Sequence, residues 1–286
     1  ITPPGFTRLR SALQAWPEIL RLLVFPRVLL ADYSPRILMP AASWTPRTLA
    51  GLLLLGGALM GGVVALLRGR GKTGLALLWA PVALLPVSNL IVPIGVLLAE
   101  RTLYIAGFVV ALGLAAAVDA VGVHRRGRLR MALVLSALVC APFAARTLQR
   151  LPSWRSTDEV FRTLLRDRPD SYRATWHHAR MAWRDGQQDS ALAYYRTTIE
   201  LWPYAPPVYL EAVMFATETG QEREARSFAE RALAHWPEDP SFLRRLAVSS
   251  LNLADTAAAL AAVERGLRVA PDDPLFNAMR AAITGR

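Results

Sequence analysis

Four prolines recur at one interval in the second half of the chain. They are Pro169, Pro203, Pro237 and Pro271, and each follows the previous one by 34 residues. Small residues keep the same phase: Gly186, Gly220 and Ala254, then Ala191, Ala225 and Ala259. An interval of this length, with small residues at fixed positions, predicts a stack of helical hairpins that bury their faces on one another.

Each recurring position has a physical role. The glycines fall where the chain turns between two helices, because glycine tolerates a positive φ. The alanines allow the two helices to approach closely, and the prolines end the second helix. These features define the tetratricopeptide repeat (TPR). We predict three full units over residues 172–271, an incomplete leading unit at 157–169 and a terminal capping helix at 275–283.

The first half of the chain is rich in apolar residues, and hydrophobic residues make up 53% of the whole sequence. Four apolar stretches lie at 48–67, 73–92, 102–123 and 131–145. The first holds twenty residues without a charge, which as a helix measures roughly 30 Å, the thickness of the hydrocarbon core. We predict about four membrane spans, of which the last is short. The fold class is therefore all-α: membrane helices followed by a TPR solenoid.

The charge of the chain indicates its orientation. The net charge is +11 and Lys72 is the only lysine. Two short arginine-rich loops, 68–72 and 124–130, separate the predicted spans, and such loops stay in the cytoplasm. The TPR domain is then expected on the periplasmic side of a bacterial inner membrane. Because much of the basic charge lies in these loops, we expect no nucleic-acid partner.

Residues 9–30 precede the first span and alternate between apolar and polar positions. Arg10, Glu18 and Arg21 interrupt the stretch, as do Pro17 and Pro26. This pattern favours an interfacial or re-entrant helix on the outer face. The alternative is a protein-covered membrane helix broken at Pro26. We expect three domains. The outer-face segment comprises residues 1–47, the membrane helices residues 48–148, and the TPR domain residues 149–286.

A group of polar residues lies at the start of the third predicted span. Asn89, Glu100, Arg101 and Tyr104 are expected on the outer face, and Asp32 faces the same side. Ionisable groups at a membrane helix end are costly unless they are paired, hydrated or functional. A carboxylate can accept a proton, and an arginine can hold a phosphate. The alternative is an ion pair that anchors the helix end. Cys140 is the only cysteine, and no metal site is predicted.

Several segments together resemble one enzyme family. They are Leu85-Pro86-Val87-Ser88-Asn89-Leu90, Pro93-Ile94-Gly95, Ala99-Glu100-Arg101-Thr102-Leu103-Tyr104-Ile105 and Ala31-Asp32-Tyr33-Ser34. The exit from the last span, from Arg146 to Trp154, fits the same pattern. In this order and ahead of TPRs, they resemble the transmembrane and TPR-containing O-mannosyltransferases, which are glycosyltransferases of the GT-C type.

The resemblance implies transfer of a sugar, typically mannose, from a polyprenyl-phosphate donor to Ser or Thr of exported proteins. The TPR groove would bind the acceptor protein. The donor-phosphate side would be lined by Arg101, Glu100, Tyr104 and Asn89. Asp32 would lie in the outer vestibule as the candidate catalytic residue. The family's acidic catalytic motif lies upstream of these segments, and metal dependence is unknown. The family often has Pro-Ser where this chain has Ala106-Gly107, which leaves the roles at this loop open.

Two further interpretations remain open from the sequence. A membrane-anchored TPR scaffold without catalysis would account equally for the spans and the repeats. The other is an outer-face enzyme with a TPR tail, such as a ligase or polymerase of surface glycans.

Overall fold

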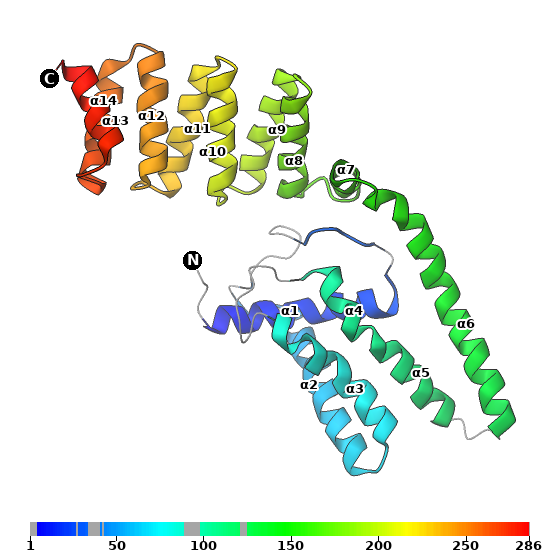
Figure 1. The fold of residues 1–286 in the computed structure, drawn as a ribbon. Helices are drawn as coiled ribbons and strands as arrows, with labels where there is room; N and C mark the ends of the chain where they lie inside the picture. The colour runs from blue at the N-terminus through cyan, green and yellow to red at the C-terminus, as the bar shows by residue number, and fades with distance from the viewer. Residues whose placement is uncertain are drawn as a thin grey trace. The chain divides into compact units, whose positions relative to one another are not determined.

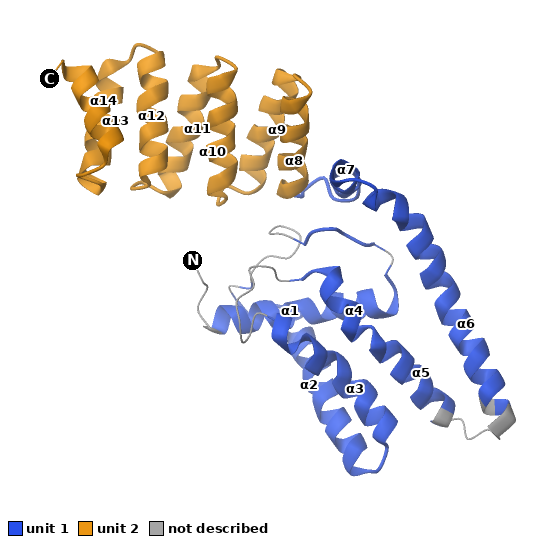
Figure 2. Cartoon of the chain, viewed as in Figure 1, with its two compact units in different colours: residues 1–171 blue, residues 172–286 orange. Residues whose placement is uncertain are grey.

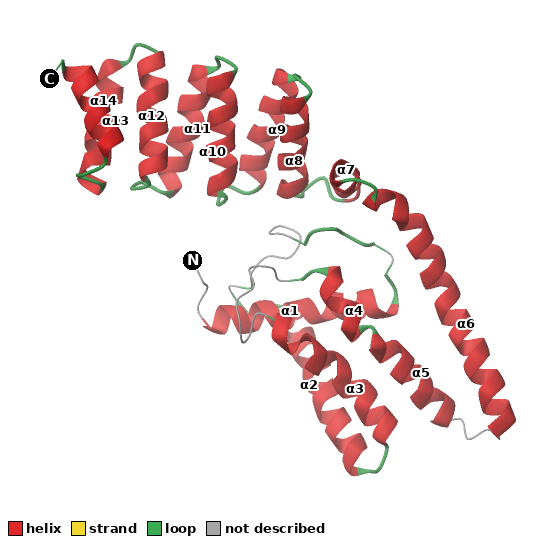
Figure 3. Ribbon diagram, in the orientation of Figure 1, coloured by secondary structure: helices red, strands yellow, loops and turns green. Residues whose placement is uncertain are grey.

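The computed structural model describes residues 5–26, 28–33, 41, 43–88, 98–120 and 125–285, and every regular element in these ranges is a helix (Figure 3). The chain forms two compact units, residues 1–171 and 172–286 (Figure 2). The predicted all-α class is therefore confirmed for the described part of the chain. Because the first unit ends at 171, it includes the helix of the incomplete leading repeat.

The first unit begins with three packed helices, α1 (Gly5–Val24), α2 (Pro46–Leu67) and α3 (Gly71–Leu84) (Figure 1). Thr45 caps α2 by accepting a hydrogen bond from the Thr48 amide at 3.2 Å. The helices α2 and α3 form a hairpin that turns at Gly69, where φ is +72°. The helix α1 crosses α2 so closely that the carbonyl of Leu13 lies against Gly51.

The rest of the first unit starts with a 3₁₀ turn, Glu100–Thr102, and a short helix, α4 (Leu103–Ala106). Then come α5 (Phe108–Ala120), α6 (Arg125–Arg150), a 3₁₀ turn at Leu151–Trp154 and α7 (Thr157–Asp167). The Trp79 indole ties α3 to α4, because it donates to the Ile105 carbonyl at 2.8 Å.

Three of the described helical segments are long and apolar enough to cross a membrane: Pro46–Leu67, Glu100–Val118 and Leu129–Trp154. Most of their side chains are not buried within the chain, as expected for a helix that meets lipid or another protein. The last of them extends well beyond the predicted short span, because the helix continues through the polar residues at both of its ends.

The prediction at 73–92 differs from the structure. The helix α3 has 14 residues and passes into a 3₁₀ turn at Leu85–Val87, so the apolar helical segment Gly71–Val87 is shorter than predicted and about the shortest length that crosses a bilayer. Two prolines account for the difference. Pro81 lies inside α3 and Pro86 lies in the turn, and a proline cannot donate the backbone hydrogen bond that continues a helix. The end of the predicted stretch lies outside the described residues.

The structure also revises the segment predicted at 9–30. The helix begins earlier, at Gly5, and ends at Val24, before Pro26. Its apolar face is buried, with Leu13, Ala15 and Leu22 at most 6% exposed. The described residues that follow it, 25–26 and 28–33, are not helical.

The second unit consists of paired helices. They are α8 (Tyr172–Arg184), α9 (Gln188–Leu201), α10 (Pro206–Glu218), α11 (Glu222–His235), α12 (Pro240–Asn252), α13 (Thr256–Val269) and α14 (Pro274–Thr284). Three predicted turns have the expected backbone: φ is +72° at Gly186, +72° at Gly220 and +59° at Ala254. The left-handed conformation costs an alanine about 1 kcal/mol, so the third turn is the strained one.

The core of the second unit confirms the predicted packing. Ala191, Ala225 and Ala259 are fully buried. The large buried side chains are aromatic and belong to successive repeats: Tyr195, Tyr209, Phe215, Phe228, Phe242 and Phe276. Four partly buried tryptophans pack against this core: Trp176, Trp183, Trp202 and Trp236. Trp236 stacks on Phe242 with ring centroids 5.9 Å apart.

Candidate functional site

The carboxylate of Glu100 holds a segment that lies far from it in the sequence. Its Oε1 accepts a hydrogen bond from the Leu30 amide and another, at 3.0 Å, from the Tyr33 hydroxyl. Leu30 is 4% exposed and Tyr33 is 3% exposed. We call residues 28–33 the anchored segment, because further side chains hold it as well.

Two arginines bind carbonyl groups of the anchored segment. Arg21 on α1 donates to the Val28 carbonyl at 2.9 Å and is itself held by Glu18 at 2.6 Å. Arg150 at the end of α6 donates to the Leu29 carbonyl and pairs with Asp167 of α7 at 2.8 Å. The anchored segment is therefore tied to α1, to the Glu100 turn and to α6.

Burial and neighbouring charges determine the protonation states of Tyr33 and Asp167 in this network. Burial, together with the negative charge of Glu100, raises the pKa of Tyr33 far above its usual range. The phenol therefore stays protonated and can donate to the carboxylate. Burial also tends to raise the pKa of Asp167, but hydrogen bonds from Arg150 and Arg166 outweigh it and lower the pKa. Asp167 thus remains charged opposite Arg150.

The structure brings together only part of the predicted site. Glu100 meets the anchored segment, which contains Asp32, a partly buried residue. Arg101 follows Glu100 but forms no ion pair with it in the described structure, since Glu100 bonds the anchored segment instead. Tyr104 is 89% exposed. The prediction at Asn89 lies outside the described residues.

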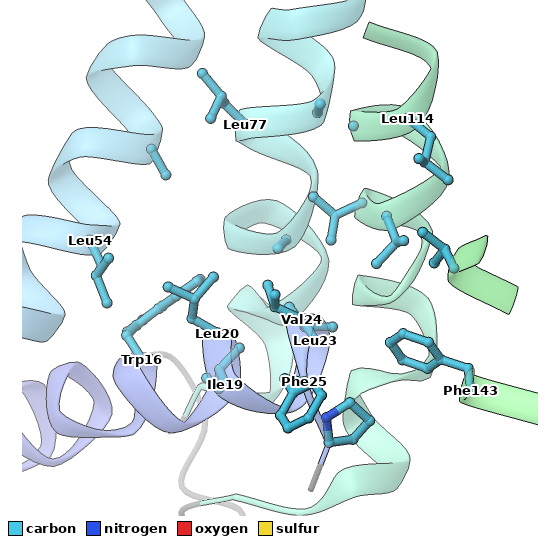
Figure 4. Close-up of a pocket in the computed structure, with 18 of the residues that line it drawn as sticks. Trp16, Ile19, Leu20, Leu23, Val24, Phe25, Leu54, Leu77, Leu114 and Phe143 are labelled. Carbon is cyan, nitrogen blue, oxygen red and sulfur yellow. The ribbon is translucent and has the colours of Figure 1, made fainter. Parts of the chain in front are cut away.

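Arg101 and Tyr104 line a cavity of about 1250 Å³ that is mostly apolar. Its walls come from α1, α3, α4, α5 and α6, with Trp79, Phe143 and Arg146 among the lining residues. A second apolar cavity, of about 1140 Å³, is bounded by α1, α2, α3, α5 and α6 (Figure 4). Both are large enough for part of a lipid chain.

Tyr33, Arg150 and Asp167 belong to this network, but no role could be predicted for them from the sequence. Tyr33 and Arg150 fall inside segments that carry the family resemblance, and that was the one available signal. No group of three potential ligands from His, Cys, Asp and Glu lies together in the described ranges.

The TPR unit has its own recess, formed by α10 and α12. It measures about 280 Å³ and is lined by Val213, Met214, Thr217, Glu218, Arg244, Arg245 and Val248. Met214 is 38% exposed and Val248 is 41% exposed. Exposed aliphatic side chains in such a recess are typical of a surface that another protein covers.

Comparisons with known proteins support the repeats. Two family models of the tetratricopeptide repeat match the chain, over residues 154–206 and 216–283. The described array therefore consists of TPRs. Curated proteins give no match.

Two solved structures resemble the chain in part. MamA from Desulfovibrio magneticus RS-1 is 14% identical and covers 51% of this chain and 84% of its own, with a TM-score of 0.38. A thermophilic TPR protein of Thermus thermophilus is 18% identical and covers 81% of this chain and 100% of its own, with a TM-score of 0.31. The assignment of the repeats rests on the family models and on the interval of 34 residues.

Proposed function

We propose that this chain is a membrane-embedded scaffold whose TPR array binds a protein ligand. The observation that carries the proposal is the recess between α10 and α12, with exposed Met214 and Val248. Three apolar helices of sufficient length for a membrane support the anchoring role. The repeats would face the periplasm, because the arginine-rich loops favour the cytoplasm.

Photo-crosslinking tests the binding role. A benzophenone amino acid at Met214 is expected to give discrete adducts with a protein in living cells. The matched control is Ala261, which is also exposed but lies on α13. Adducts from position 214 and none from position 261 would support a ligand in the recess. Equal adducts from both positions, or none from 214, would contradict the proposal.

Glycosyl transfer is the second candidate, and the contacts of Glu100 favour it. Glu100, Arg101 and Tyr104 border one mostly apolar cavity, so a carboxylate and an arginine lie beside a space that could take a lipid chain. In this proposal Arg101 binds the phosphate of a polyprenyl-phosphate-linked sugar, typically mannose, and the cavity takes part of its lipid chain.

The remaining roles in that proposal follow from the chemistry. Transfer to a Ser or Thr hydroxyl needs a base, and Asp32 is the candidate within this chain. Glu100 would hold the anchored segment that carries Asp32, and Tyr104 would border the donor. The TPR array would select the acceptor protein. This enzyme and the scaffold share the same ligand-binding array, so the crosslinking experiment tests a step common to both.

A further inference from the structure

The two layers of TPR helices differ in charge. The helices α8, α10, α12 and α14 carry six arginines and two glutamates, a net charge of +4. The helices α9, α11 and α13 carry six arginines and six acidic residues, a net charge of zero. The recess belongs to the basic layer, since its lining comes from α10 and α12.

Several arginines of the TPR unit pair with an acidic residue of a neighbouring helix or turn. Arg180 pairs with Glu211, Arg196 with Glu224 at 2.6 Å, and Arg226 with Asp255 at 2.7 Å. These pairs link neighbouring helices and have a structural role.

Arg245 differs from these paired arginines in its contacts. It lines the recess and is only partly exposed, yet it has no ion pair or hydrogen bond within the described structure. Its neighbour Arg244 lies 3.7 Å from Asp273, a long ion pair. Burial, and then the charge of Arg244, lowers the pKa of Arg245. A guanidinium that is partly desolvated and unpaired is costly unless an anion binds it.

The walls around Arg245 restrict what the anion can be attached to. Val213, Met214 and Val248 supply an apolar surface, and Thr217 supplies a hydroxyl. Glu218 lines the same recess, so a highly charged ligand would meet repulsion there. A carboxylate next to an aliphatic side chain satisfies both the guanidinium and the apolar wall.

We propose that the recess binds an acidic segment of the protein ligand, with a carboxylate on Arg245 and a neighbouring aliphatic side chain against Met214 and Val248. This rests on the proposed function and names the class of its partner. The guanidinium can bind the carboxylate through two parallel hydrogen bonds.

Fluorescence anisotropy on the full chain in detergent tests the proposal. The probe is a labelled synthetic peptide with one carboxylate, Gly-Ser-Leu-Asp-Leu-Ser-Gly, amidated at its C-terminus, and its counterpart carries Asn in place of Asp. The wild-type chain is expected to bind the acidic peptide about tenfold more tightly, since a charge-assisted pair contributes about 1.5 kcal/mol or more. Arg245→Gln is expected to remove this difference.

Arg268→Gln is the matched control, because Arg268 is exposed on α13 and its replacement changes the net charge equally. It is expected to leave acidic-peptide binding unchanged. Equal losses in both variants would overturn the proposal in favour of diffuse electrostatic attraction. Equal binding of the two peptides to wild type, or no binding of either, would also overturn it.

Crosslinking at Met214 separates this proposal from the proposed function. If the peptides are not distinguished while adducts at position 214 persist, the acidic preference alone is wrong. If the adducts are missing as well, the binding role of the array is also wrong.

Discussion

Replacing Gly51 with alanine is expected to release α1 from α2. A Cβ atom at residue 51 would overlap the Leu13 carbonyl oxygen and lie 2.6 Å from its carbon. Both are backbone atoms, so no side-chain rotation can relieve the overlap. The helices must separate, and we expect a loss of about 3 kcal/mol in local stability. This corresponds to a roughly hundredfold faster hydrogen exchange of the buried α1 amides.

The control is on the same helix. Gly56 has no neighbour within 4 Å of its Cβ position, so Gly56→Ala creates no contact. Because alanine favours a helix over glycine by about 1 kcal/mol, this variant should leave α1 exchange unchanged and slow the exchange of α2. Wild-type exchange of α1 in Gly51→Ala would show that the two helices do not cross at this glycine.

The second large effect concerns Glu100. Glu100→Ala removes the acceptor of both the Leu30 amide and the Tyr33 hydroxyl. Two buried donors are then left without a partner, which costs about 3 kcal/mol. We expect the anchored segment to detach and the Leu30 amide to exchange with solvent roughly a hundredfold faster.

Glu100→Gln separates the structural contribution from a chemical one. Glutamine keeps a side-chain oxygen that can accept both hydrogen bonds, but it lacks the negative charge. The anchored segment should therefore stay protected to within about tenfold of wild type. If the chain transfers sugars, this variant is expected to lose glycosylation while its membrane insertion is unchanged. Wild-type glycosylation in Glu100→Gln would remove the charge of Glu100 from the mechanism.

The TPR unit could be predicted from the sequence because its contacts are local and repeat. Pro203, Gly220 and Ala225 each fix one feature of a hairpin, and the next repeat copies that feature. Residues 275–283 could be recognised as a final helix for the same reason, and α14 confirms it. The stretch at 73–92 is interrupted by Pro81 and Pro86 in the sequence, but these prolines alone do not show where the helix ends, because α3 continues past Pro81.

The anchored segment could be predicted only in part. Glu100 and Asp32 were expected on one face from the order of the apolar stretches. The contacts that hold the segment join residues 70 and 121 positions apart, Leu30 to Glu100 and Leu29 to Arg150. No local pattern encodes such pairs, since the hydrogen bonds go to backbone groups that every residue carries.

The central claim is that the apolar helices span a membrane and place the TPR array outside the cytoplasm. Measuring on which side of the membrane single cysteines can be labelled tests it most directly. Cys140 would be replaced by serine, and a single cysteine placed either at Gly71, the exposed first residue of α3, or at Ala261 on α13. Spheroplasts would then be treated with a membrane-impermeant maleimide. The account predicts labelling at 261 in intact spheroplasts and at 71 only after lysis. The reverse pattern, or labelling of both positions before lysis, would contradict it.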